Sequence, residues 1–183
     1  MGRSPAVRLF FALNFSPEVT KAIQQVQRSL REFSPTALFP GPENLHLTLA
    51  FLREVSLPQM EKAREALQAL SPIPMELRFS RVGKFTQRGK ELWWLGADPC
   101  AQLFSLQKDL LLQLEQRGFS LERKTFKPHV TLARNVVFPA AVPELTDLLP
   151  APIEAVCGTV SLMRSQLTPA GAVYTELAKK TAK

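Results

Sequence analysis

Residues 43–51 are ENLHLTLAF and residues 126–134 are FKPHVTLAR. These stretches contain the only histidines of the 183-residue chain, His46 and His129. In both, an apolar residue, a threonine and a leucine follow the histidine. Two such matches arise by chance in well under about one per cent of cases, although short motifs carry a risk of false positives. The repeated His-x-Thr-Leu pattern therefore indicates a shared role.

Both stretches have the pattern of a β-strand, in which successive side chains point to opposite faces. In the first stretch Thr48 shares a face with His46, while the leucines on either side point away. The same alternation puts Thr131 on the face of His129. A polar face on an otherwise apolar strand lines either a hydrogen-bonded interior or a cavity.

Alternating strands and helices are predicted on either side of these strands. Ser16 and Pro17 are typical of a helix start, and apolar residues spaced by three and four positions follow them. Gly118 is typical of a helix end. The predicted order is a strand at 7–15, a helix at 16–33, a loop at 35–42, a strand at 45–52, a helix at 57–70, a strand at 75–82, a charged hairpin loop at 85–91, a strand at 92–97, a helix at 99–117, a strand at 126–134, a short helix at 143–149, and strands at 153–163 and 172–178.

The order of elements repeats along the chain. Leu9 precedes His46 by 37 residues, and Leu92 precedes His129 by the same 37. Two similar lobes packed together would relate the histidine strands by an approximate two-fold axis, and both histidines would face one central cleft. Since alternating helices and strands are common, the equal spacing also has an accidental explanation.

The composition is that of a globular protein with 45% hydrophobic residues and a mass of 20.4 kDa. We expect residues 1–183 to form a single domain of two pseudo-repeated lobes, with sequence halves at about 7–85 and 91–178. Cys100 and Cys157 have no metal-site or redox-motif spacing. Because the chain also lacks a long apolar segment and a typical signal peptide, we expect a cytoplasmic protein with no membrane association.

The chain is basic, with a net charge of +7 and a pI of about 9.8. This balance suits a polyanionic partner but is also common in proteins without one. Positive charge gathers around the second histidine stretch, and a solvated charged rim is the alternative interpretation. The residues concerned are Arg117, Arg123, Lys124, Lys127 and Arg134.

Several kinds of active site lack support in the sequence. A zinc site needs three or four ligands, and two histidines without a cysteine cluster are too few. A nucleophile elbow, a phosphate-binding glycine loop and a dinucleotide-binding glycine motif are absent. A single strand histidine is most often structural, but two in matching frames favour acid–base chemistry. With a usual pKa near 6.5, one imidazole accepts a proton while the other donates one.

Such a pair suits in-line displacement at a phosphodiester, with threonine hydroxyls donating to the non-bridging oxygens. At this level the chain resembles the two-histidine (2H) phosphoesterases, and most closely their RNA 2′,3′-cyclic phosphodiesterase branch, also called LigT-like or 2′-5′ RNA ligase-like. The resemblance extends over RLFFALNFSPEV, ENLHLTLAFLREV, LWWLG, FKPHVTLAR and SQLTPAGAVYTEL. It implies a bilobal α+β fold, in which two pseudo-symmetric lobes with antiparallel sheets flank a central cleft and helices lie outside.

The resemblance also implies an activity, hydrolysis of a terminal 2′,3′-cyclic phosphate on RNA to a 2′-phosphate without metal or cofactor. It carries the catalytic roles to His46 and His129, the first as acid to O3′ and the second as base for water. By the same resemblance Thr48 and Thr131 bind the phosphate. The expected partner is RNA with a cyclic phosphate end, such as tRNA fragments, with no obligate protein partner.

Three further residues follow from the resemblance. Arg134 matches an arginine that helps to hold phosphate, although strict alternation puts it on the face opposite His129, so this role requires a strand end or a bend. Phe51 matches an aromatic position that stacks the terminal base, and an ordinary core phenylalanine is the alternative. Arg53 stands where the family commonly has glycine, and contributes either a phosphate contact or a strand end.

Other functions remain compatible with the same residues. One alternative is the reverse reaction at the same site, 2′-5′ ligation of RNA ends. Another is a two-histidine activity on small cyclic nucleotides or oligoadenylates. In a non-catalytic RNA-binding module, the basic cleft would only bind the RNA. That last alternative predicts that both histidines are replaceable, and it leaves the two His-x-Thr frames unexplained.

Overall fold

The computed structural model describes residues 6–87, 89–122, 124–138, 143–144, 148–168 and 171–182, without the Gln87 side chain. The described chain forms eight strands, three α-helices and one short 3₁₀-helix. The strands are β1 Val7–Asn14, β2 His46–Val55, β3 Met75–Gln87, β4 Lys90–Ala97, β5 His129–Val136, β6 Ile153–Cys157, β7 Thr159–Thr168 and β8 Gly171–Thr181. The helices are α1 Pro17–Phe33, α2 Leu57–Ala69 and α3 Ala101–Gln116, with the 3₁₀-helix at Pro42–Asn44.

The predicted α+β class and antiparallel pairing are confirmed, but the strands form one continuous sheet. Its order is β6-β3-β4-β5-β2-β1-β7-β8, so the two histidine strands are neighbours at the centre. A single residue pair, Leu47 with Val130, joins β2 to β5. The two expected sheets are therefore joined edge to edge, and each half of the sheet takes strands from both halves of the sequence.

The sheet is strongly curled. One residue, Gly158, links β6 at one edge to β7 near the other edge, so the edges must approach each other at this point. The carbonyl oxygen of Gly158 accepts a hydrogen bond from the Ala182 amide at 2.7 Å, which fastens the end of β8 there. The single strand predicted at 153–163 is thus two strands that belong to opposite halves of the sheet.

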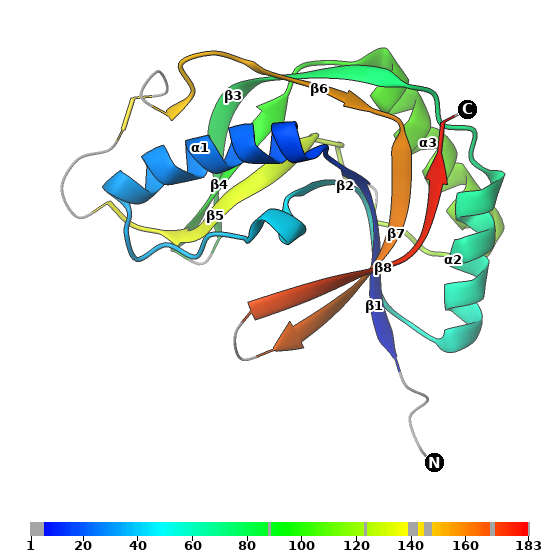
Figure 1. The fold of residues 1–183 in the computed structure, drawn as a ribbon. Helices are drawn as coiled ribbons and strands as arrows, with labels where there is room; N and C mark the ends of the chain where they lie inside the picture. Colours follow the sequence, from blue (N-terminus) through cyan, green and yellow to red (C-terminus); the bar gives the residue numbers. More distant parts are fainter. Residues whose placement is uncertain are drawn as a thin grey trace.

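The helices cover one face of the sheet. Ser16 caps α1 by accepting from the Val19 amide, and the predicted apolar stripe is buried from Val19 to Leu30. α1 packs against β5 and β6, whereas α2 and α3 lie side by side against the strands of the other half (Figure 1). The buried apolar residues of all three helices belong to one core with the sheet. The opposite face, called the open face below, carries the histidines.

One predicted loop differs from the structure, and most of one predicted helix lies outside the described residues. The charged loop predicted at 85–91 is mostly strand, because β3 and β4 continue towards a tight turn at Gly89, whose φ of 73° suits glycine. An ion pair between Lys84 and Glu91 links the two strands near that turn. Most of the short helix predicted at 143–149 lies outside the described residues, as does Arg123.

Candidate active site

The central strands bring the two motifs together. Leu47 and Val130 pair across the sheet, and both are fully buried in the core. Each follows its histidine directly, so the alternation of side chains turns both histidines and both threonines to the open face. The antiparallel register aligns Thr131 with His46 and Thr48 with His129.

The two imidazoles are held in the same way. Nδ1 of His46 lies 2.8 Å from the carbonyl oxygen of Asn44, and Nδ1 of His129 lies 2.6 Å from that of Lys127. A carbonyl oxygen only accepts hydrogen bonds, so each Nδ1 carries the proton. In the neutral ring Nε2 then has a free lone pair. Both histidines are therefore oriented to accept or donate a proton through Nε2.

Each of these carbonyl groups belongs to an anchored segment. The side-chain amide of Asn44 donates to the carbonyl oxygen of Ala172 in β8 at 3.2 Å. Beside the second histidine, the Ala97 amide donates to the Pro128 carbonyl oxygen at 3.1 Å. Strands of the sheet thus fix the backbone that sets the direction of both rings.

The site disfavours positive charge on both rings in the absence of a ligand. The pKa of His46 is lowered from 6.5 to about 4, mainly by burial; the Asn44 carbonyl opposes this shift, and the charges of Arg134 and His129 contribute to it. Burial also lowers the pKa of His129, again with a contribution from Arg134. Because the charge of Arg134 acts on both histidines and that of His129 acts on His46, these three groups lie within electrostatic range of one another.

A bulge in β5 explains the position of Arg134. Thr131 pairs with Trp94 and Ala133 with Trp93, so Leu132 is an extra residue. Leu132 and Ala133 are both fully buried, and the alternation shifts by one position. The bend that the sequence required is this bulge, and it returns Arg134 to the face of His129.

The first histidine strand has the same bulge. Ala12 pairs with Thr48 and Phe11 with Ala50, so Leu49 is the extra residue. Phe51 therefore reaches the open face, where its side chain is 46% exposed. Its exposure excludes the core interpretation of this phenylalanine.

A buried glutamine supports the bulge of β5. Gln27, on α1, is 7% exposed, and its side-chain amide donates to the carbonyl oxygens of Leu132 and Pro40 at 3.0 Å each. The backbone of Arg134 also pairs with Leu38 in both directions, at 2.8 and 2.9 Å. The helix and the loop that follows it thus hold the strand segment that presents Arg134.

An aromatic group surrounds His46 on the open face. The ring of Phe10 lies 4.9 Å from the imidazole and that of Tyr174 lies 5.2 Å from it. Phe51 extends this group through a stacked contact with Phe10 at 6.2 Å, and the Arg8 guanidinium lies 5.5 Å from the Phe51 ring. Sequence reasoning missed Phe10 and Tyr174, although the alternation in β1 puts Phe10 opposite the core-facing Leu9 and Phe11.

Another aromatic group surrounds His129. Phe85 and Trp94 lie 5.4 and 6.2 Å from the imidazole, ring centre to ring centre. A cavity of about 340 Å³ opens beside these three residues. No local sequence pattern identifies this group, because its members come from three different strands, β3, β4 and β5.

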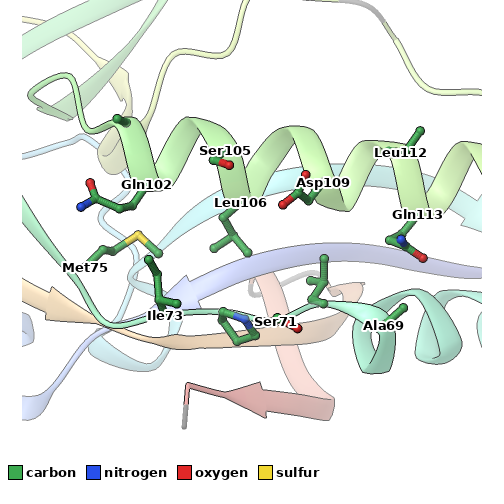
Figure 2. A pocket seen from close by; sticks show the side chains of 13 residues that line it. Ala69, Ser71, Ile73, Met75, Gln102, Ser105, Leu106, Asp109, Leu112 and Gln113 are labelled. Atoms are coloured by element: carbon green, nitrogen blue, oxygen red, sulfur yellow. The ribbon is translucent and has the colours of Figure 1, made fainter.

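A larger cavity lies away from the histidines. It has a volume of about 590 Å³ and runs between α3 and the segment that joins α2 to β3 (Figure 2). Its lining includes Met75, Leu106 and Asp109, but neither histidine. Size alone therefore does not locate the site, and the chemistry of the histidine pair does.

The predicted basic cluster is divided. Arg134 and Lys127 belong to the site, and the Lys127 ammonium lies 5.9 Å from the Phe85 ring centre. Arg117 instead bonds to Gln113 on its own helix and lies 3.7 Å from a carboxylate oxygen of Glu65. The charged-rim interpretation holds for Lys124, whose ammonium group pairs with Glu122.

Arg53 has a backbone conformation that favours glycine, with a φ of 61°. Its side chain is 70% exposed and pairs with the carboxylate of Glu122. This left-handed conformation is one that glycine adopts without steric cost, so it gives a physical reason for the glycine that the family resemblance led us to expect here. The ion pair links β2 to the segment that precedes β5.

No group of three or more histidine, cysteine or acidic side chains is placed to hold a metal ion within the described ranges. Cys100 and Cys157 are free thiols, the second of them buried. None of the described helices is long and apolar enough to span a membrane.

The sequence and the fold both have relatives. The chain is 30% identical over 172 residues to an RNA 2′,3′-cyclic phosphodiesterase of Thermotoga maritima, which covers 92% of this chain and 91% of that protein. It is 33% identical over 182 residues to an RNA 2′,3′-cyclic phosphodiesterase of Thermus thermophilus, with 94% and 89% covered. The crystal structure of E. coli LigT in apo form has a TM-score of 0.80 at 25% identity and covers 98% of this chain and 99% of that one. The family model of the 2′-5′ RNA ligase superfamily matches residues 15–169, and the chain belongs to this superfamily.

Proposed function

We propose that the protein is an RNA 2′,3′-cyclic phosphodiesterase, which hydrolyses a terminal 2′,3′-cyclic phosphate to a 2′-phosphate. The observation that carries this proposal is the pair of imidazoles held on one face, each with Nδ1 fixed by a backbone carbonyl and Nε2 free. The names of the relatives from Thermotoga maritima and Thermus thermophilus support the same activity.

The phosphorus atom lies between the two histidines in this proposal. Nε2 of His129 accepts a proton from water, whose oxygen bonds to phosphorus opposite O3′. The P–O3′ bond breaks, and O3′ takes a proton from Nε2 of His46. The 2′-phosphate remains on the ribose, and none of these steps uses a metal ion.

The groups around the histidines stabilise the charge that develops on phosphate. The hydroxyls of Thr48 and Thr131 donate to the non-bridging oxygens, and Arg134 adds a positive charge beside both imidazoles. The free site lowers the pKa of His46, so its protonation accompanies the arrival of the anion. The same surroundings disfavour the positive charge of the protonated imidazole. His46 therefore donates its proton readily to the leaving oxygen O3′.

The substrate is an RNA end, including ends of tRNA fragments, and its terminal base stacks on Phe51. Nearly half of the Phe51 side chain is exposed beside the Phe10 and Tyr174 rings, which offers a flat surface next to His46. We assign the protein to the cytoplasm, where its two free thiols stay reduced. It acts without an obligate protein partner.

A short RNA with a 2′,3′-cyclic phosphate, incubated in EDTA, tests this function. The expected product carries its phosphate at the 2′ position. Because general acid–base groups contribute about 10²–10⁴-fold, His46→Ala and His129→Ala should each lose at least about a hundredfold in kcat. Turnover that survives both substitutions would reject the proposal, and RNA binding without turnover in the wild type would favour a non-catalytic module.

A further inference from the structure

The two bulges that follow the threonines are supported in the same way. In each motif the extra residue is the leucine after the threonine, Leu49 in β2 and Leu132 in β5. An extra residue stands outside the regular pairing of its strand, and a buried carbonyl group there needs a donor from elsewhere. For Leu132 that donor is the side-chain amide of Gln27 on α1, at 3.0 Å.

The donor for Leu49 is a second helix glutamine. The side-chain amide of Gln107, on α3, donates to the carbonyl oxygen of Leu49 at 3.4 Å. Leu49 is 3% exposed, and β2 meets β5 at Leu47, so no residue of the described strands is paired with Leu49. Gln107 is itself partly buried, and its hydrogen bond joins α3 to the strand of the first motif.

The two supports exchange the halves of the sequence. Helix α1 lies in the first half and holds the bulge of the second motif, whereas α3 lies in the second half and holds the bulge of the first. The same contact therefore occurs twice, from different helices, at matching atoms of the two motifs. Its repetition indicates that both glutamines fix the change of face that follows each threonine.

Each bulge presents a different side chain to the open face. After Leu132 this side chain is Arg134, whose charge acts on both histidines. After Leu49 it is Phe51, which is 46% exposed. The histidine and the threonine of each motif precede the bulge, so loss of either support acts first on the residue that follows it.

We propose that Gln107 is a positioning residue for base recognition, which fixes the bulge at Leu49 so that Phe51 presents its ring to the terminal base of the RNA. This inference rests on the proposed function for the role of Phe51. Gln27 has the corresponding part for the phosphate, through Arg134. The two helices thus support recognition of separate parts of one ligand, α3 for its base and α1 for its phosphate.

Binding of two ligands at the histidines separates these parts. Adenosine 2′-phosphate has a base and inorganic phosphate has none, and NMR titration of the two imidazoles measures both dissociation constants. Gln107→Leu should raise the Kd of adenosine 2′-phosphate by about threefold to tenfold, the usual contribution of one hydrogen bond, and leave that of inorganic phosphate unchanged. Gln27→Leu should raise both dissociation constants, because Arg134 contacts the phosphate of either ligand.

Further variants test whether the effect passes through Phe51. In the Phe51→Ala background, Gln107→Leu should have no additional effect on adenosine 2′-phosphate. Gln107→Glu keeps the shape of the side chain without the amide donor, so it should weaken the nucleotide as Gln107→Leu does. Gln102→Leu is the matched control, because Gln102 is an exposed glutamine of the same helix that bonds to the Cys100 thiol, and it should leave both dissociation constants unchanged.

Three results would overturn the role of Gln107. They are equal affinities of the wild type for the two ligands, an equal effect of Gln107→Leu and Gln107→Glu on both, and a full effect in the Phe51→Ala background. A purely structural contribution would lower the free energy of unfolding in urea but keep the ratio of the two dissociation constants. Because adenosine 2′-phosphate is a product, its binding is scored apart from turnover. A wild type that binds it without hydrolysing a cyclic phosphate would count against the proposed function instead.

Discussion

Acid should destabilise the protein through His46 by an amount that follows from its surroundings. Burial lowers the pKa of His46 from 6.5 to about 4 in the folded chain, so the unfolded chain binds a proton first as the pH falls. The free energy of unfolding is therefore lost between about pH 6.5 and pH 4, and the loss levels off below that range. The contribution at neutral pH is fully retained, since both states are then unprotonated.

The size of the loss follows from linkage. For a pKa of 6.5 in the unfolded chain and about 4 in the folded chain, the loss is about 2 kcal/mol at pH 5 and about 3 kcal/mol at pH 4. His46→Gln removes this titration but keeps a side chain of similar size. The stability of the wild type relative to His46→Gln should thus fall by about 2 kcal/mol between pH 7.5 and pH 5.

Urea unfolding at a series of pH values measures both proteins. Titrations of surface carboxylates and of His129 occur in both and largely cancel in the difference. Parallel stability curves from pH 7.5 to pH 5 would refute the reasoning, because they would mean that His46 is not held neutral by the fold. A difference of the opposite sign would require a raised pKa and a nearby anion.

Three further outcomes are expected. The kcat of cyclic phosphate hydrolysis should follow a bell-shaped pH profile, and a flat profile from pH 5 to 9 would count against acid–base roles for the histidines. Gln27→Leu removes a buried donor to the carbonyl oxygens of Leu132 and Pro40, so the free energy of unfolding in urea should fall by about 1–3 kcal/mol. The kcat should fall as well, because the strand segment that carries Arg134 loses this support. An unchanged free energy of unfolding and an unchanged kcat would reject that role of Gln27. Gly96→Val should displace the Trp94 indole, because a β-carbon on Gly96 would overlap the ring, and a near-ultraviolet circular dichroism spectrum identical to the wild type would contradict this close packing.

Local periodicity predicted the elements and the two polar pairs well. The alternation in 45–52 and 126–134 placed His46 with Thr48 and His129 with Thr131, and Ser16 marked the start of α1 correctly. These features depend on neighbours within one strand or one helical turn, which the sequence displays directly.

It was harder to predict from the sequence which face of the sheet the residues after the two threonines point to. Both motifs continue with Leu-Ala, and in both these residues are consecutive buried positions at a bulge. Strict alternation therefore gave the wrong face for Arg134 until a bend was added. The paired Leu-Ala was the signal for the bulge, because two adjacent core residues interrupt the period of two.

The aromatic residues around the two histidines could not be predicted from local sequence, because long-range packing brings them there. Tyr174 reaches His46 from β8, and Phe85 reaches His129 from β3, so neither neighbour is adjacent in sequence to its motif. Arg117 is close to the second motif in sequence, yet its helix directs it towards Glu65 on α2. Sheet order and helix packing decide these contacts, and local patterns do not contain them.

The central claim is that one phosphate binds between both imidazoles. Imidazole nitrogen NMR of the ¹⁵N-labelled protein, titrated with a nucleoside 2′-phosphate at pH 6, measures this directly, since the chain has two histidines and His46→Gln assigns them. Signals of both rings should shift with one common Kd, and Nε2 of at least one ring should become protonated as the anion binds. A response from a single ring, or two different dissociation constants, would contradict a shared phosphate site.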